Sequence, residues 1–236
     1  MTRLTPRFDG KSVLVAGGTG GLGQAVSLAF LLEGAKLVVT YRRQEEFAAL
    51  REAAGDHAER LTGVVADVTN ETSVRSLAAE TVDVLVNAVG AYAGGLPVWQ
   101  TDEALLQRMF DLNFRSGFVL ARAFVPAMIA QHRGAIVNVA SRAAVDHAAG
   151  AVAYAASKAA AVALIDCLAA DLKGTGVRAN SVLPGIIDTA ANRSAMPDAD
   201  FSKWPKPSQI ADVILFLCSD EATLISGASV PVYGEA

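Results

Sequence analysis

Short apolar runs rich in Val, Ile and Leu alternate along the chain with longer segments in which apolar residues recur at helical spacing. Such runs are typical of parallel strands buried on both faces, and the longer segments are typical of amphipathic helices. Seven strands are predicted, at residues 12–16, 36–40, 61–66, 84–88, 135–140, 178–183 and 228–232. Helices are predicted at residues 22–33, 45–54, 71–80, 102–131, 151–173 and 208–218. Right-handed crossovers then place helices on both faces of a doubly wound, seven-stranded parallel sheet in an α/β fold.

The predicted elements follow one another without an internal repeat or a domain-separating linker, so residues 1–236 are expected to form a single domain. Pro126 is expected to bend or divide the long helix at 102–131. Residues 185–207 form the longest stretch without clear periodicity, which makes this segment a candidate lid. Trp204 within it is compatible with two roles, covering a site or anchoring the segment.

Composition narrows the classes of protein. Hydrophobic residues make up 52% and charged residues 19% of the chain, which argues against disorder and indicates elements covered on most sides. The 20 Lys and Arg residues and 24 Asp and Glu residues give a formal net charge of −4, so neither nucleic acid nor a membrane is expected as a partner. The sequence shows no signal-peptide pattern, no 18-residue uncharged apolar run and no CxxC pair. A cytoplasmic protein with reduced cysteines is therefore expected. Metal-ligand spacing is also missing, and no metal is expected.

A glycine-rich turn follows the first predicted strand and leads into an apolar helix. It comprises Gly17, Gly18, Thr19, Gly20, Gly21, Leu22 and Gly23. Glycines let the chain turn tightly and approach a pyrophosphate, while a helix N-terminus supplies free N–H groups and partial positive charge. The spacing matches GxGxxG, GxxGxxG and GxxxGxG at once. By itself it predicts a dinucleotide-binding turn, with a turn that binds nothing as the alternative.

The end of the second predicted strand bears on which dinucleotide is bound. Tyr41, Arg42 and Arg43 stand where an NAD site usually carries a carboxylate for the ribose 2′-hydroxyl. A guanidinium suits a 2′-phosphate, so these residues favour NADP(H) over NAD(H), with two solvated arginines as the alternative. Asp67 and Val68, after the third strand, are candidates to receive the adenine ring.

A phenol and an ammonium group are predicted to share one helix face, because Tyr154 and Lys158 are four residues apart. A nearby cation stabilises a phenolate, so Lys158 would lower the pKa of Tyr154 from about 10 toward neutrality. A YxxxK pair also arises by chance in such a chain, so the pair needs support from other residues.

In order and spacing, these residues resemble the short-chain dehydrogenase/reductase superfamily, specifically its single-domain oxidoreductase branch. The resemblance runs from about residue 9 to residue 233. It rests on Gly17-x-x-x-Gly21-x-Gly23, Asp67-Val68, Asn87-Ala88-Val89-Gly90, Asn113, Ser141, Tyr154-x-x-x-Lys158, and Pro184-Gly185 with Ile187 and Thr189. It implies a Rossmann-type fold and the GxxxGxG alternative for the glycine turn.

The resemblance implies hydride transfer between a nicotinamide ring and a small carbonyl or alcohol substrate. Tyr154 would be the general acid in reduction and the general base in oxidation. Ser141 would hydrogen-bond the substrate oxygen, and Lys158 would hold the nicotinamide ribose. Asn113 would interrupt its helix and bind a water of a proton relay, with an ordinary polar helix residue as the alternative.

The remaining cofactor contacts also follow from the resemblance. They are the glycine turn, residues 41–43, Asp67, Val68, residues 87–90, Pro184, Gly185, Ile187 and Thr189. The segment between Asp67 and Asn87 is shorter than expected for the family, so that edge of the fold is expected to be trimmed or mobile. The family's pairing of helices corresponding to 102–131 and 151–173 implies a homodimer or homotetramer.

Two alternative functions are less well supported by the sequence. A non-catalytic NADP(H)-binding sensor or scaffold would be favoured by loss of Ser141, Tyr154 or Lys158, and all three are present. An epimerase or dehydratase is disfavoured by the chain length and by the position of Ser141. His147 and Arg142 are each compatible with a place at the substrate mouth or in solvent.

Overall fold

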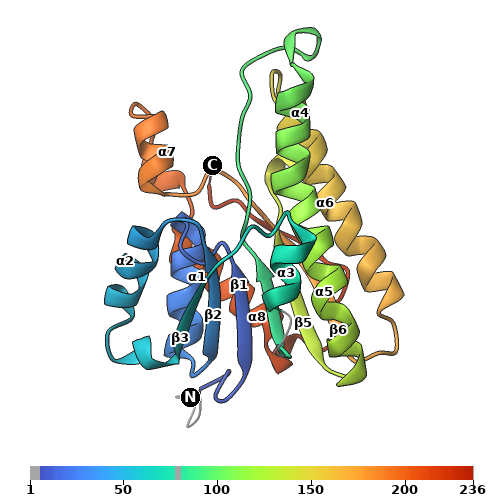
Figure 1. The fold of residues 1–236 in the computed structure, drawn as a ribbon. Helices are drawn as coiled ribbons and strands as arrows, with labels where there is room; N and C mark the ends of the chain where they lie inside the picture. Colours follow the sequence, from blue (N-terminus) through green and yellow to red (C-terminus); the bar gives the residue numbers. More distant parts are fainter. Residues whose placement is uncertain (1–5, 78–80, 236) are drawn as a thin grey trace.

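Seven parallel strands form one sheet in the computed structural model, which describes residues 6–77 and 81–235. The spatial order is β3-β2-β1-β4-β5-β6-β7, so the chain reverses its direction of travel between β1 and β4 (Figure 1). In such sheets ligands bind at this switch point, beyond the carboxyl ends of the strands. The strands are β1 Ser12–Ala16, β2 Lys36–Tyr41, β3 Leu61–Val65, β4 Val84–Asn87, β5 Gly134–Val139, β6 Val177–Pro184 and β7 Ser229–Val232. The predicted α/β Rossmann-type fold is confirmed.

Helices cover both faces of the sheet (Figure 1). The helices α1 and α8 pack together on one face, and α3, α5 and α6 lie on the other. Their bounds are α1 Gly21–Leu32, α2 Gln44–Ala54, α3 Glu71–Leu77, α4 Glu103–Phe110, α5 Ser116–Ala130, α6 Val152–Asp171, α7 Ala190–Ala195 and α8 Pro207–Cys218. Alternate residues of β1 point into different cores, Val13 and Val15 toward α1 and Leu14 and Ala16 toward α5. Burial on both faces explains why the strands are continuous apolar runs.

The long helix predicted at 102–131 is divided near Asn113, the residue that the resemblance implies would interrupt it, and not at Pro126. A π-helical turn at Asp111–Arg115 separates α4 from α5, whereas Pro126 lies inside α5 without ending it. Pro126 therefore does not divide the helix. At this turn, where the backbone widens, the buried side chain of Asn113 makes hydrogen bonds to Ala91 in the loop after β4. Residues 78–80 of the helix predicted at 71–80 lie outside the described residues.

The aperiodic segment 185–207 contains α7 and a 3₁₀ turn at Phe201–Lys203. The Thr189 side chain caps α7 by accepting a hydrogen bond from the backbone N–H of Asn192 at 3.2 Å. The hydrophobic periodicity of the sequence did not indicate this helix. Trp204 is 7% exposed and packs on the Phe201 ring with 4.9 Å between centroids. Of its two possible roles, Trp204 therefore anchors the segment.

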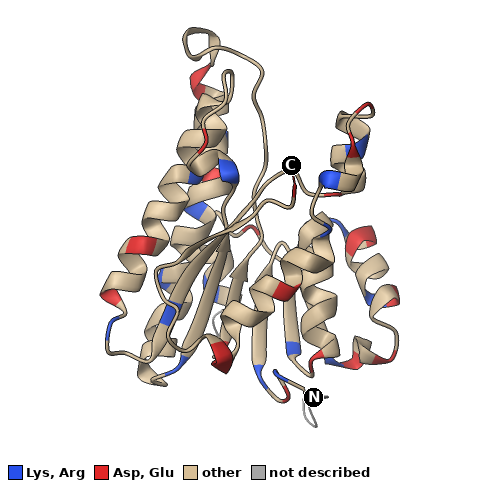
Figure 2. Ribbon diagram, turned by 180° about the vertical axis from the view of Figure 1, so that it is seen from behind, with Lys and Arg blue, Asp and Glu red and all other residues tan. Residues whose placement is uncertain are grey.

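Charged residues of both signs are interspersed over the elements seen in Figure 2. Within the described ranges, α6 is the one helix long and apolar enough to cross a membrane by length and composition. It packs against β6 and α4 as a core helix, and only part of its surface is covered by the rest of the chain.

Candidate active site

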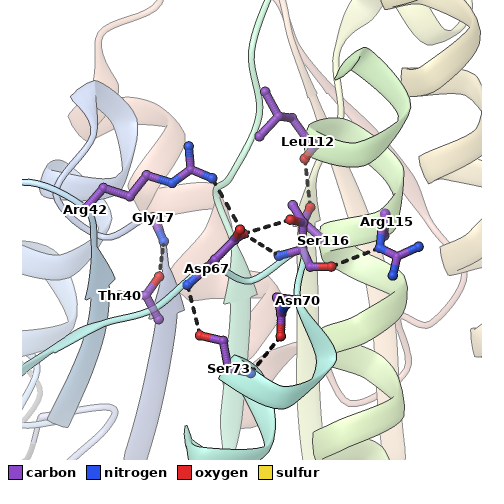
Figure 3. Close-up of polar contacts among 10 residues, drawn as sticks. Gly17, Thr40, Arg42, Asp67, Asn70, Ser73, Leu112, Arg115 and Ser116 are labelled. Atoms are coloured by element: carbon purple, nitrogen blue, oxygen red, sulfur yellow. Dashed lines mark hydrogen bonds and ion pairs between the residues drawn. The ribbon is translucent and has the colours of Figure 1, made fainter. Parts of the chain in front are cut away.

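The glycine turn joins β1 to α1 in a backbone shape that side chains would obstruct. Gly17 has a φ of +73°, and its amide donates to the Thr40 hydroxyl at 2.9 Å (Figure 3). A Cβ on Gly23 would lie 2.0 Å from the Gly17 carbonyl oxygen, and one on Gly18 would lie 2.6 Å from the Val39 side chain. A Cβ on Gly20 would meet nothing closer than 3.5 Å. Gly17, Gly18 and Gly23 thus allow the helix to start close against the strand.

The N-terminus of α1 suits a pyrophosphate. Gly20 is the N-cap residue and supplies no side chain, and the first turn, within the described residues, contains no acidic group. No side chain of the described residues therefore caps its first backbone N–H groups, which lie at the switch point of the sheet. These residues fit the diphosphate of a dinucleotide.

Ser141, Tyr154 and Lys158 come together from β5 and α6, and with Asn113 we call them the reacting cluster. Ser141 follows the end of β5, and Tyr154 lies in the first turn of α6. The Ser141 hydroxyl lies near the Tyr154 phenol and favours its ionised form. All three side chains line one cavity of about 190 Å³. Its other walls are Leu22, Ala88, Val89, Gly90, Ala91, Tyr92, Val139, Ala140, Pro184, Gly185 and Ile187. The structure thus gathers much of the predicted cofactor and catalytic set around one space.

Burial controls the ionisation of this cluster. Desolvation raises the pKa of Tyr154, the Ser141 hydroxyl opposes this rise, and nearby Tyr92 adds to it. Desolvation also lowers the pKa of Lys158 from 10.5 to about 8. The expected lowering of the Tyr154 pKa by Lys158 is not found, because loss of solvent outweighs the other influences on the phenol. The Lys158 ammonium instead donates to the Val139 carbonyl at 2.9 Å.

Asn113 connects three parts of the site from the π-helical turn. Its amide oxygen accepts from the Ala91 amide at 2.9 Å, and its amide nitrogen donates to the Ala91 carbonyl and the Ser157 hydroxyl, both at 3.0 Å. A Cβ on Gly90 would lie 2.9 Å from this oxygen and 3.0 Å from the Lys158 nitrogen. Asn113 therefore fixes the loop after β4 against α6, and Gly90 lets that loop pass beside Lys158. The relay water stays a prediction.

Four charged residues lie past the ends of β2 and β3, and we call Arg42, Arg43, Glu46 and Asp67 the charged cluster. Arg42 reaches toward Asp67 in an ion pair of 3.6 Å (Figure 3). Hydrogen bonds from the Thr69 amide and hydroxyl lower the pKa of Asp67. Arg43 instead pairs with Glu46.

The other predicted residues near this end are distributed as follows. Tyr41 ends β2 and stacks on the Phe47 ring at 4.8 Å. Val68 is 3% exposed and lies in the core on the α5 face, outside the cavity of the reacting cluster. Thr189 lies against Gly21, and a Cβ added at Gly21 would be 3.0 Å from the Thr189 methyl group. Asn87 is buried and donates to Asn138 at 2.9 Å, so it joins β4 to β5 beneath the site.

Two residues of the site were not predicted from the sequence. Tyr92 lines the cavity and meets the Tyr154 ring edge-on, with 5.0 Å between centroids. Glu46 accepts a hydrogen bond from the Thr19 hydroxyl at 3.1 Å while it binds Arg43. The spacing of three residues from Arg43 to Glu46 at a helix start could have indicated their pairing. Nothing in the local pattern around Tyr92 indicated its contact.

The residues beside the substrate mouth also have defined surroundings. Arg142 pairs with Asp146 at 2.9 Å and lies over the Tyr233 ring at 5.2 Å from its centroid. His147 is exposed and is not among the residues that line the cavity. Neither side chain points to a particular substrate.

Fold and site together define a Rossmann-type dinucleotide-binding protein with a Ser, Tyr and Lys cluster at the switch point. Residues 11–200 match the family model described as short chain dehydrogenase, and the chain belongs to this family. It is 31% identical to 3-oxoacyl-(acyl-carrier-protein) reductase FabG of Thermotoga maritima, with 97% of this chain and 98% of that protein covered. It is 34% identical to galactitol 2-dehydrogenase of Rhizobium johnstonii, with 96% and 95% covered.

A solved structure shows the same likeness in three dimensions. It is a 3-oxoacyl-(acyl-carrier protein) reductase from Brucella melitensis with bound NAD, which matches with a TM-score of 0.88 and 27% identity. The match covers 99% of this chain and 93% of that chain. Family membership makes the protein an oxidoreductase of alcohol and carbonyl groups with a fold that binds nicotinamide cofactors.

Proposed function

We propose that the protein is an NADP(H)-dependent oxidoreductase that interconverts a small carbonyl compound and a secondary alcohol, with Tyr154 as general acid and base. One observation carries this proposal. Tyr154 and Ser141 line one cavity together with buried Lys158 and with the loops that the family uses for its cofactor. All three residue types needed for the reaction are therefore within reach of one substrate carbonyl.

The side chains divide the chemistry between them. The bound nicotinamide supplies the hydride in reduction and accepts it in oxidation. Tyr154 donates a proton to the carbonyl oxygen in reduction and takes it from the hydroxyl in oxidation. Its raised pKa keeps the phenol protonated at neutral pH, which is the form that donates. Ser141 donates a hydrogen bond to the same oxygen and stabilises its developing charge. Lys158, with a pKa of about 8, is mainly an ammonium at neutral pH and is assigned to the nicotinamide ribose.

The preference for NADP(H) rests on the charged cluster. Arg42 is 63% exposed and its ion pair with Asp67 is a long one, so its guanidinium is accessible to an added anion. Tyr41 places no carboxylate at the end of β2 to repel that anion. A guanidinium binds a phosphate dianion through two parallel hydrogen bonds, which supports a 2′-phosphate contact.

We also propose that two or four copies associate through α4, α5 and α6. Leu106, Phe110, Phe114 and Phe118 recur every four residues and line one groove along α4 and α5. Leu106 and Phe118 remain 39% and 41% exposed, and apolar α6 is only partly covered. Light scattering that shows a monomer at micromolar concentration and neutral pH would contradict this assembly. The cytoplasmic location expected from the sequence stays a prediction.

The proposed activity is tested by a substrate screen. Ketones, quinones, sugars and acyl thioesters are each offered with NADPH, and their alcohol counterparts with NADP⁺, while cofactor absorbance is followed. Turnover of one class is expected. NADPH binding without turnover of any class would favour the alternative, a cofactor-binding sensor or scaffold.

A further inference from the structure

The two arginines after β2 have different partners. Arg43 donates from its Nε to Glu46 at 2.9 Å, and its Nη2 contacts the same carboxylate oxygen. These contacts raise the pKa of Arg43, and Glu45 adds a weaker attraction. Arg42 has one ion pair, to Asp67 at 3.6 Å. Within the described residues Arg43 is therefore engaged by a carboxylate, while Arg42 is held loosely.

Glu46 also reaches the glycine turn. Its second carboxylate oxygen accepts from the Thr19 hydroxyl at 3.1 Å, and its side chain is 28% exposed against 67% for Arg43. One carboxylate thus joins the first turn of α2 to the turn at the start of α1. Because two partners hold it, the Glu46 carboxylate keeps one orientation, whereas a solvated surface carboxylate does not.

We infer that Glu46 sets the limit on how strongly this chain selects a 2′-phosphorylated cofactor. Arg42 supplies the attraction for the phosphate. Glu46 opposes it in two ways, by engaging the guanidinium of Arg43 and by placing a negative charge next to the same turn. Any action of Glu46 on the diphosphate is common to both cofactors, but a 2′-hydroxyl carries no charge, so its action at the 2′ position is specific to NADP(H). This inference rests on the proposed cofactor site and adds a selectivity residue to it.

The test uses two probes that lack nicotinamide and need no turnover. Adenosine 2′,5′-bisphosphate and AMP differ only in the 2′-phosphate, and the ratio of their dissociation constants is measured by calorimetry. Glu46→Gln removes the charge while keeping the size and a hydrogen-bonding oxygen. Glu52→Gln, on an exposed part of the same helix, is the matched control for net charge.

Glu46→Gln should raise the preference for the bisphosphate about threefold, the effect of removing one partly exposed charge. An effect on the 5′-phosphate that both probes share cancels in this ratio. An unchanged thermal midpoint is expected, because the glutamine keeps the size of the side chain. The double variant Glu46→Gln/Arg43→Ala should return to the wild-type ratio, since it lacks both charges of the pair.

The outcomes separate this inference from the proposed function. A ratio in Glu46→Gln equal to that in Glu52→Gln would overturn the role of Glu46 alone. A double variant that keeps the whole gain would overturn the part assigned to Arg43. Failure of wild-type protein to bind either probe, or NADPH and NADH, would overturn the proposed function together with the inference.

Discussion

The reacting cluster and the charged cluster lie at the same edge of the sheet but are held by different forces. Ser141, Lys158 and Asn113 are 9%, 4% and 1% exposed, and their hydrogen bonds run to backbone or to other buried groups. In the charged cluster, Arg42, Arg43 and Asp67 are each more than half exposed and are held by ion pairs. Burial makes the first arrangement rigid and shifts its pKa values, while water and salt screen the second.

This difference teaches how the two tasks are divided. Proton transfer requires a donor fixed within hydrogen-bond distance, so the groups that perform it are enclosed. Cofactor selection requires only a difference in charge at one position, and exposed side chains can supply that. Substitutions in the reacting cluster should therefore have large effects insensitive to salt, and those in the charged cluster should have smaller effects that salt reduces.

The largest effect is expected for Tyr154→Phe. The ring still packs against Tyr92, but the hydroxyl that exchanges the proton is removed. Turnover should fall by about 10²-fold or more, with NADPH affinity unchanged. Steady-state kinetics beside cofactor titration measure the two quantities, with Tyr92→Phe as the control. Retention of more than about a tenth of wild-type turnover would defeat the role of Tyr154.

Arg42→Ala should come next. Loss of one charge-assisted contact should weaken NADPH binding by about 1.5 kcal/mol, the lower end of the usual range because the side chain is 63% exposed. NADH binding should not change. Titration of both cofactors at low and high salt measures this, with Arg51→Ala on α2 as the control. Equal wild-type affinities for NADPH and NADH would contradict the preference.

Gly90→Ala probes the packing of the reacting cluster. The added methyl group would lie 2.9 Å from the Asn113 oxygen and 3.0 Å from the Lys158 nitrogen. The free energy of unfolding should fall by about 1 to 3 kcal/mol, as for other overpacked sites, and turnover should fall with it. Gly20→Ala, where a Cβ meets nothing closer than 3.5 Å, should leave stability nearly unchanged. Chemical denaturation measures the stability of both variants. Equal stability of Gly90→Ala and Gly20→Ala would mean that the reacting cluster is loosely packed.

The smallest effect is a pH dependence of stability from Lys158. Its pKa is about 8 in the folded protein and near 10.5 when unfolded, so between these values the unfolded chain binds more protons. The burial cost is fully present below pH 8 and is relieved as the pH rises. Relative to Lys158→Met, wild-type protein should gain about 1 kcal/mol between pH 7 and pH 9.

The comparison with Lys158→Met is needed because other groups act in the opposite direction. Burial raises the pKa of Cys218 to about 12 and that of Tyr154 above its usual value, and both lower stability as alkaline pH is approached. Denaturation of the two proteins at several pH values isolates the lysine. If the difference in free energy of unfolding between wild-type protein and Lys158→Met stayed constant from pH 7 to pH 9, Lys158 would not be desolvated.

The sequence by itself determined the alternation of strands and helices, the turn at Gly17 to Gly23 and the spacing of Tyr154 to Lys158. These features are local, because burial on both sides of a strand and the repeat of a helix act on neighbouring residues. The seven strands accordingly lie close to their predicted positions.

Tertiary structure alone decided which groups face each other and how far each is removed from water. It left Pro126 inside α5 without ending the helix, set Tyr92 against Tyr154, and raised the Tyr154 pKa where a lysine neighbour had suggested lowering. It also brought Asp67 beside Arg42, left the Arg42 guanidinium accessible, and set the Glu46 carboxylate against the Thr19 hydroxyl. Desolvation and ion pairing depend on residues brought together from distant strands and helices, so no local pattern contains them.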